Sequence, residues 1–402
     1  MEVGGRVLGT TKPPLSPLME RVARRHAEGR DVFVLAQAMV DYPPPFAFMH
    51  ALREALAADT ATLHTYTPDA GTVELRTALS DHADRSFGFW TDPISQILVT
   101  PGANHAAYTA LSVLLDPGDD VLLISPWYFN HEMTVRLLGG NVLTVIARPE
   151  DCFVPRVDEL LAAWTPRLKA LILVNPNNPT GARYPNEWIE SFAAALTEDS
   201  RWQNVWILSD QTYQEIYFDN EPPLSPAALP ELKDRTLTAG SFSKSLALAG
   251  WRLGFLTGPK AFISETLKVQ DSSVICATHA SQWALCKALE ETAAIADYLQ
   301  DKRGLLRRRR DALYAPLSTD KNLDVCLPGG ACFFFVGLPE GIDGEVFAHH
   351  LLESYDVATV PGIHFGPEWK RFLRVSYGTE SPERLEQAAL RLCECLASWR
   401  DT

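Results

Sequence analysis

One lysine and one arginine stand in a stretch of small and apolar residues that spans Gly240 to Phe255, GSFSKSLALAGWRLGF. The two cations, Lys244 and Arg252, are eight positions apart in a setting that otherwise indicates burial. Moving a charge into a low-dielectric interior is costly unless the charge is neutralised, paired or used chemically. A lysine amine can form a Schiff base with an aldehyde cofactor, and an arginine can hold that cofactor's phosphate. The stretch therefore predicts these two roles for Lys244 and Arg252.

The same chemistry needs further groups, and the sequence offers them at the ends of predicted strands. A pyridine ring acts as an electron sink only while its nitrogen stays protonated, which a nearby carboxylate favours. Asp210 follows the apolar run WILS and supplies that carboxylate, while Asn178 in the loop NPNNPTG can donate to a ring oxygen. A predicted helix opens at Ala103 and Asn104, and its first amides suit a phosphate. Ligands of α/β sheets bind at the carboxyl ends of strands, so we expect these groups to converge on Lys244.

These motifs resemble those of the fold-type I pyridoxal-phosphate enzymes, specifically the class I/II aminotransferase family. The lysine stretch is similar to the family's S-x-S-K-x-x-x-x-x-G-x-R-x-G signature, and the resemblance runs from about residue 14 to residue 400. It implies pyridoxal 5′-phosphate as the cofactor, bound to Lys244 as a Schiff base. It also implies exchange of an amino group between an amino acid and a 2-oxo acid.

The resemblance implies a role for each further site residue. The implied cofactor contacts are phosphate binding by Ser241 and Arg252, ring-oxygen contacts from Asn178 and Tyr213, a pyridine-nitrogen contact from Asp210, and ring stacking by Tyr128, with Trp127 and Phe129 as rival stackers. Tyr66, in YTPDAGTVELR, is implied to reach the phosphate of the neighbouring subunit. Arg374, in RFLRVSYG, is implied to bind the substrate carboxylate. A homodimer with a shared active site is therefore expected.

The chain departs from the family beside the expected substrate. The segment VLAQAMVDYPPP aligns with L-x-Q-G-x-P-x-F-x-P-P, so Ala38 replaces a glycine and Val40 a proline. A Cβ at a point of close approach changes the shape of a pocket, so Ala38 is expected to line the substrate side. Asn104 stands where some dicarboxylate-specific relatives have a lysine. We therefore predict a specialised α-amino acid substrate, with poor activity toward common acidic and aromatic amino acids.

Transamination is the leading reaction, and two other classes of function stay open. A pyridoxal-phosphate-dependent lyase, replacement enzyme or cyclase would use the same electron sink and the same lysine as proton carrier. A catalytically silent regulatory relative would keep the fold without turnover. The complete set of Lys244, Asp210, Tyr213 and Arg374 argues against a silent protein.

The elements that must position these residues follow an α/β pattern. Short apolar runs alternate with helical patterns from about residue 95 to 258, which predicts a large domain with a mainly parallel central sheet flanked by helices. A strand in GACFFFVGL and a helix opening at Ser381-Pro382-Glu383 predict a smaller α+β domain. The expected divisions are an N-terminal arm with part of the small domain over 1–45, a large cofactor-binding domain over 46–290, and a small C-terminal domain over 291–402.

Charge and cysteine usage exclude several classes of partner. The chain has 36 basic and 50 acidic residues and a net charge of −14, so it is expected to repel nucleic acid and anionic membrane. The basic run Arg307–Arg310 is accordingly interpreted as a solvated helix face. The seven cysteines are scattered, without CxxC or Cys/His spacing, which predicts reduced thiols and no metal site. No apolar run has the length of a signal peptide or a membrane span, so we expect a cytoplasmic protein.

Overall fold

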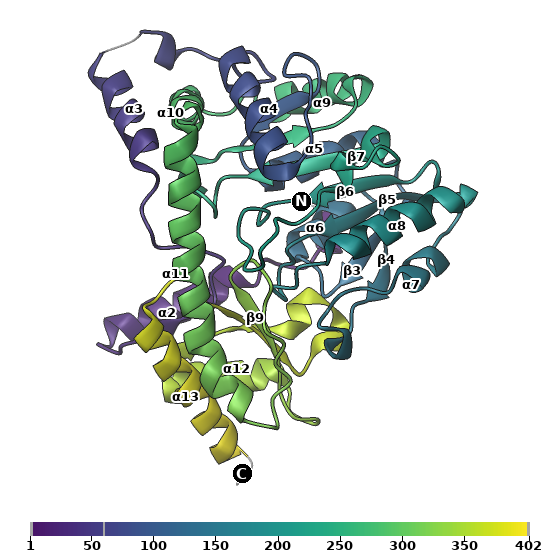
Figure 1. Ribbon diagram of the computed structural model, residues 1–402. Helices are drawn as coiled ribbons and strands as arrows, with labels where there is room; N and C mark the ends of the chain where they lie inside the picture. The colour runs from purple at the N-terminus through teal and green to yellow at the C-terminus, as the bar shows by residue number, and fades with distance from the viewer. Residues whose placement is uncertain (1–2, 59–60, 400–402) are drawn as a thin grey trace.

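A seven-stranded sheet forms the centre of the computed structural model, which describes residues 3–58 and 61–399 (Figure 1). Its strand order is β2-β8-β7-β6-β5-β3-β4, and neighbouring strands are parallel except where β8 meets β2 and β7. The predicted α/β fold with a mainly parallel sheet is therefore confirmed. In chain order the strands are β2 (Ile97–Thr100), β3 (Asp120–Ser125), β4 (Asn141–Ile146), β5 (Leu168–Val174), β6 (Trp206–Asp210), β7 (Thr236–Ser241) and β8 (Gly254–Thr257).

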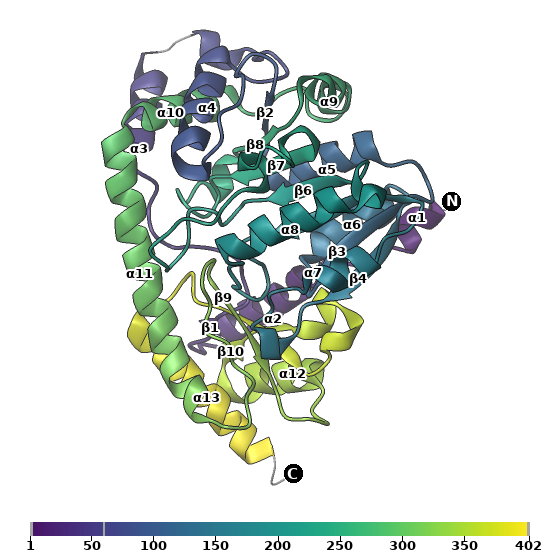
Figure 2. The same cartoon turned by 45° about the vertical axis from the view of Figure 1, so that its right-hand side comes forward.

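Strand β5 has an unbroken apolar run over residues 170–174 because helices cover both faces of the sheet (Figure 2). In β5, Leu171 and Leu173 pack in one hydrophobic cluster with α8 (Asn186–Glu198). Ala170 and Ile172 pack in another cluster, with α5 (Ala103–Leu114) and α9 (Lys260–Ser273). Successive side chains of a strand point to opposite faces, so an unbroken apolar run is what a strand covered on both sides requires.

Further helices surround this sheet. They are α3 (Phe46–Ala57), α4 (Val73–Phe87), α6 (Phe129–Leu137), α7 (Val157–Ala162) and α10 (His279–Glu290). Helix α4 begins where the Thr72 hydroxyl accepts a hydrogen bond from the Leu75 amide at 3.3 Å, and it ends at Gly88, whose φ is 75°. Among the described residues, none of the helices combines the length and the apolar character that crossing a membrane demands.

A second sheet has three antiparallel strands in the order β11-β12-β9. These are β9 (Phe333–Gly337), β11 (Val360–Pro361) and β12 (Phe372–Ser376), and they are accompanied by α12 (Gly344–Tyr355) and α13 (Pro382–Trp399). The long helix α11 (Thr292–Thr319) starts beside α10 and packs along α13, so it borders both parts of the chain (Figures 1 and 2). The strand expected in GACFFFVGL is thus β9, and the Ser381 hydroxyl accepts from the Arg384 amide at 3.3 Å at the start of α13.

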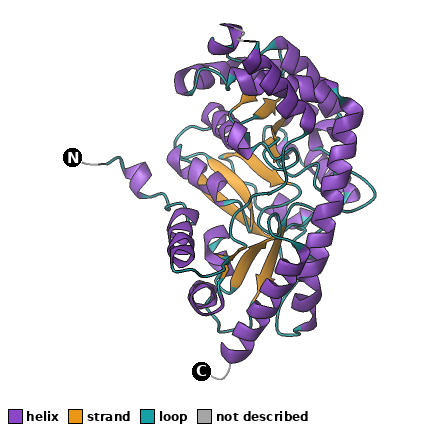
Figure 3. Cartoon of the chain, turned by 90° about the vertical axis from the view of Figure 1, so that its left-hand side faces the viewer, coloured by secondary structure: helices purple, strands orange, loops and turns teal. Residues whose placement is uncertain are grey.

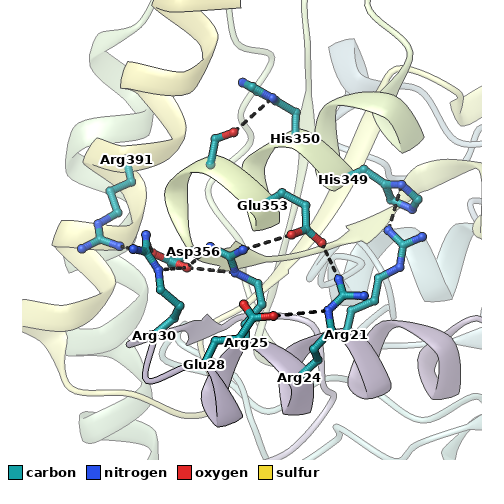
Figure 4. A network of polar contacts seen from close by, with 11 residues as sticks. Arg21, Arg24, Arg25, Glu28, Arg30, His349, His350, Glu353, Asp356 and Arg391 are labelled. Atoms are coloured by element: carbon teal, nitrogen blue, oxygen red, sulfur yellow. Dashed lines mark hydrogen bonds and ion pairs between the residues drawn. The ribbon is translucent and has the colours of Figure 1, made fainter.

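The N-terminal part packs on the C-terminal part. Strand β1 (Phe33–Val34) pairs in parallel with β10 (Val357–Ala358), and α2 (Leu15–Ala27) lies against α12. Asp356, at the end of α12, accepts at 2.6 Å from both Arg25 and Arg30 (Figure 4). Before α2, the chain runs out to the short helix α1 (Gly5–Leu8) (Figure 3), which contacts α6 beside the large sheet. The outer limits of the expected domains, residues 1 and 402, lie outside the described residues.

The basic run on α11 is only partly a solvated face. Arg307 and Arg308 are exposed, but Arg309 is buried and donates to both carboxylate oxygens of Asp41, at 2.8 and 3.0 Å. It also donates to the Gly378 carbonyl at 2.6 Å. With 3.6 residues per turn, consecutive side chains face different directions. The interpretation as a solvated face is therefore wrong for Arg309, which ties α11 to the segment that follows Ala38.

Candidate active site

A cavity of about 140 Å³ opens at the carboxyl ends of the parallel strands. All of the predicted site residues except Tyr66 and Arg374 line it, and Val174, Thr212 and Ser243 complete the wall. The predicted residues along the cavity are Ala38, Ala103, Asn104, Tyr128, Asn178, Asp210, Tyr213, Ser241, Lys244 and Arg252. Parallel strands end at the same edge of a sheet, so side chains far apart in sequence meet there.

Lys244 lies just beyond β7, with its amine inside the cavity. Its Nζ donates a hydrogen bond to the Ala38 carbonyl, and the Tyr42 hydroxyl donates to the Lys244 carbonyl at 2.7 Å. Burial lowers the pKa of Lys244 to about 8, and the positive charges of Arg374 and Arg252 act in the same direction. A lysine with such a pKa holds much more of the neutral, nucleophilic amine near neutral pH than an exposed lysine does.

Asp210 is the last residue of β6 and forms a fixed anion in the cavity. Its Oδ1 accepts from the Thr212 amide at 3.0 Å and from the Thr212 hydroxyl at 2.6 Å. His131 Nε2 lies 3.2 Å from Oδ2. Burial acts to raise the pKa of Asp210, but hydrogen bonds from His131 and Thr212 outweigh it and hold that pKa below its ordinary value. The carboxylate therefore stays ionised, as a partner for a protonated ring nitrogen must.

A cradle for an anion lies where α5 begins. Gly102, directly before α5, has a φ of +86°, and a Cβ on it would lie 2.7 Å from Nη2 of Arg252. That Nη2 donates to the Pro101 carbonyl at 2.7 Å, while Nη1 donates to the Ala249 carbonyl at 3.0 Å. The hydroxyls of Ser241 and Ser243 lie 2.9 Å apart. Helix amides, a guanidinium and two hydroxyls together suit a phosphate.

Tyr128 forms a wall of the cavity, and its rivals Trp127 and Phe129 do not line it. Tyr128 directly precedes α6, and its hydroxyl accepts from Asn130 Nδ2 at 2.8 Å. The Tyr128 ring meets the His131 ring edge-on, with centroids 5.3 Å apart. Burial raises the pKa of Tyr128, so the phenol stays neutral at physiological pH.

Arg374 is fully buried on β12 and reaches the cavity through Asn178. Its Nη1 donates to Asn178 Oδ1 at 3.0 Å, and its Nη2 donates to the Ala36 carbonyl at 2.7 Å. The guanidinium lies over the rings of Phe333 and Phe365, at 4.8 and 5.1 Å from their centroids. Among the described residues, its Nε has no hydrogen-bond partner and no carboxylate pairs with the guanidinium. A buried cation of this kind is suited to an anionic ligand.

Two positions singled out in the sequence, Tyr66 and Val40, do not line the cavity. Tyr66 is 76% exposed and lies outside the cavity of its own chain. Ala38 lines the cavity, but Val40 packs in a hydrophobic cluster with Tyr42 and Phe333 instead. The side chain of Val40 therefore does not form the cavity wall, because it packs in the apolar core of the second sheet.

The sequence reasoning missed three residues that the structure brings to the site. Thr212 and Ser243 had a local signal, since each stands two positions after a predicted polar site residue and can bond to it. His131 had none, because its contact with Asp210 arises only when α6 and β6 are packed together. In the described part of the chain, no cluster of three or more histidine, cysteine, aspartate or glutamate side chains could hold a metal ion.

Comparisons with known proteins identify the family of the chain. The family model for aminotransferase class I and II matches residues 30–392. An aspartate/prephenate aminotransferase of Thermus thermophilus is 34% identical over 369 residues, which cover 92% of each chain. An arginine–pyruvate transaminase of Pseudomonas aeruginosa is 32% identical over 382 residues, 94% of this chain and 93% of that one.

Solved structures show the same fold. A Thermus thermophilus aspartate aminotransferase double mutant superposes with a TM-score of 0.90 at 32% identity, covering 98% of this chain and all of the other. An aromatic aminotransferase from Pyrococcus horikoshii superposes with a TM-score of 0.86 at 31% identity, covering 94% and 99%. The chain therefore belongs to the class I and II aminotransferases, which are pyridoxal-phosphate-dependent transferases of fold type I.

Proposed function

We propose that this aminotransferase holds pyridoxal 5′-phosphate as a Schiff base on Lys244. The observation that carries the proposal is the buried amine of Lys244, whose pKa is lowered to about 8, in one cavity with Asp210 and Arg252. At pH 7 such an amine is unprotonated in about one molecule in ten, against about one in three thousand for an ordinary lysine. That difference favours Lys244 as the nucleophile toward an aldehyde.

The residues of the cavity fit the cofactor. Gly102 leaves space that a Cβ would fill, beside Arg252 and the first amides of α5, for the phosphate. Asp210 is the anion for the ring nitrogen, and Asn178 and Tyr213 are the contacts for the ring oxygen. When bound, the cofactor supplies the electron sink that acidifies the α-carbon of an amino acid.

The protein's own groups then bind the substrate and move a proton. Arg374 binds the α-carboxylate, since its buried charge has no carboxylate partner within the described ranges. Asn178, which now accepts from Arg374, lies between that guanidinium and the cavity. The neutral amine of Lys244 takes the proton from the α-carbon of the substrate. The same amine then delivers that proton to the second carbon that must be protonated for amino-group transfer.

The substrate is proposed to be a specialised α-amino acid. The relatives are named for aspartate and prephenate, arginine, and aromatic amino acids, so the family alone leaves the side chain open. The methyl of Ala38 and the neutral Asn104, both lining the cavity, support a narrow pocket without a cation for acidic side chains. The assay is a stopped-flow spectrum with aspartate, glutamate, phenylalanine and tyrosine. Rapid, complete amino-group transfer from any of these would contradict the narrow pocket, and keto-acid release without transfer would indicate a lyase.

The active site is further proposed to lie at the interface of a cytoplasmic homodimer, with Tyr66 serving the neighbouring subunit. An open groove of about 510 Å³ adjoins the cavity and shares Asn104 and Arg252 with it, which leaves room for an entering side chain. The exposed rings of Phe46 and Trp283 line a larger groove of about 810 Å³ between α3 and α10, which supports an interface there. A fully active species that sediments as a monomer would refute the dimer.

The division into an arm over 1–45, a large domain over 46–290 and a small domain over 291–402 is likewise proposed. The pairing of β1 with β10 and the contacts of Arg25 with Asp356 support joining the N-terminal part to the C-terminal unit. Limited proteolysis tests it, because cleavage is expected between these units rather than within them.

The test of the central role is chemical trapping. Borohydride should fix the cofactor on the peptide that contains Lys244 and abolish the visible absorption band. Lys244→Ala should lose both the adduct and turnover, whereas Lys260→Ala, at the exposed start of α9, should keep both. An adduct on another lysine in the wild-type protein would contradict the assignment.

A further inference from the structure

Two of the seven cysteines meet where the two sheets adjoin. Cys152 follows the short turn Pro149–Asp151 after β4, the edge strand of the large sheet, and Cys326 precedes β9 of the second sheet. The Pro149 carbonyl accepts from the Cys152 amide at 2.9 Å and from the Cys326 thiol at 3.3 Å. Both residues are thus held on one oxygen atom, so Cys152 and Cys326 lie side by side.

The backbone around Cys152 is fixed against the second sheet. Cys152 and Phe153 have φ values of 47° and 62°, in the left-handed region. The Phe153 ring packs edge-on against Phe335, Trp369 and Phe372, with centroids 5.7, 5.8 and 6.3 Å apart. This packing holds the turn that carries Cys152 against the second sheet, where the Pro149 carbonyl also accepts from Cys326.

The two thiols differ in exposure, which sets the order in which a reagent meets them. Cys152 is exposed, so a dissolved reagent reaches it first. Cys326 is half-buried, and burial together with the neighbouring Cys152 raises its pKa to about 12. Cys326 therefore stays protonated at neutral pH, with its S–H on the Pro149 carbonyl, and the exposed Cys152 is the first thiol to meet the reagent.

We propose that Cys152 and Cys326 are a reversible oxidation site that closes to a disulfide by exchange with a small-molecule disulfide such as oxidised glutathione. The Cys152 thiolate attacks one reagent sulfur, which forms a mixed disulfide and releases one glutathione thiolate. Cys326 then gives its proton to solvent and attacks the Cys152 sulfur, which releases the second glutathione. Two protein thiols are oxidised and one reagent disulfide is reduced to two thiols. The product links the large sheet to the second sheet.

The test treats the full-length protein with oxidised glutathione and measures intact mass, thiol alkylation and thermal unfolding. We expect two of the seven thiols to become unreactive, the mass to fall by two hydrogens, and a Cys152–Cys326 peptide that reductant separates. The unfolding midpoint should rise by about 5 °C and return on reduction, because the crosslink restricts the unfolded chain.

Single-cysteine variants test the order of events. Cys326→Ser should stop at a glutathione adduct on Cys152, Cys152→Ser should form neither product, and Cys276→Ser should behave as the wild type. Three results would each overturn the proposal. They are seven alkylatable thiols in the treated wild type, a persistent adduct on Cys152 in the wild type, and a crosslink that survives in Cys152→Ser.

Discussion

Replacing Lys244 with methionine should stabilise the cofactor-free protein, and by an amount that depends on pH. The pKa of Lys244 is about 8 in the folded chain against 10.5 for an ordinary lysine, so the folded state disfavours the ammonium. Between these values the unfolded chain binds more protons, and the wild type therefore gains stability as the pH rises. Linkage gives a penalty of about 3 kcal/mol at pH 7, about 2 kcal/mol at pH 9 and close to zero by pH 11. Methionine has a similar length and no charge, so Lys244→Met removes that penalty.

The assay is urea unfolding of both cofactor-free proteins at pH 7, 9 and 10.5. The advantage of Lys244→Met should shrink steadily across this series. Lys321→Met, at an exposed position, is the control and should show no such trend. A pH-independent difference, or a methionine variant less stable than the wild type at pH 7, would refute the reasoning that burial depresses the pKa of this amine.

Three further substitutions test other parts of the site. Gly102→Ala should weaken pyridoxal-phosphate binding at least tenfold in a fluorescence titration, because its Cβ would lie 2.7 Å from Nη2 of Arg252, the proposed phosphate ligand. Gly118→Ala, where φ is +91° but nothing lies within 4 Å, should bind normally. Asp210→Asn should lower kcat by about a hundredfold or more while the cofactor Kd changes far less, since the carboxylate acts on developing charge; equal losses in both would contradict this role. Glu215 lies 2.9 Å from His82 in a buried pair, and although burial acts to raise its pKa, His82 outweighs it and keeps that pKa low. The pair therefore stabilises at neutral pH and loses this contribution as the pH falls, so Glu215→Gln should lower the free energy of unfolding by about 3 kcal/mol at pH 7 and by less at pH 4.

The sequence could predict which residues meet because parallel strands impose the meeting place. Asp210, Asn178 and Lys244 each follow an apolar run too short for a helix, and Ala103 opens a helix directly after another such run. Once those runs are assigned to one sheet, their carboxyl ends share an edge, and the polar residues beyond them have to converge. Local patterns and one topological rule are therefore enough to bring these residues together.

Contacts between separately folded layers could not be predicted in this way. His131 reaches Asp210 from α6, and Arg309 reaches Asp41 from the middle of α11. In both cases the sequence shows a polar residue in a helix, which is ordinarily exposed. Only the angle and depth at which that helix packs decide whether the side chain points to solvent or to a carboxylate of another segment. The packing of the helix depends on the tertiary structure, and the periodicity of the sequence does not reveal it.

The segment around Ala38 shows why residue type alone could not predict the shape of the pocket wall. Two neighbouring segments fix its backbone. Gly378 packs so closely that a Cβ on it would lie 1.9 Å from the Met39 carbonyl oxygen, and Arg309 binds Asp41. Val40 is anchored in the apolar core of the second sheet. The Ala38 carbonyl, which accepts from the Lys244 amine, is therefore positioned by its neighbours rather than by its own side chain. The methyl of Ala38 changes only the space beside that amine, so under the proposed function it affects which substrates fit and leaves the proposed cofactor-binding groups as they are.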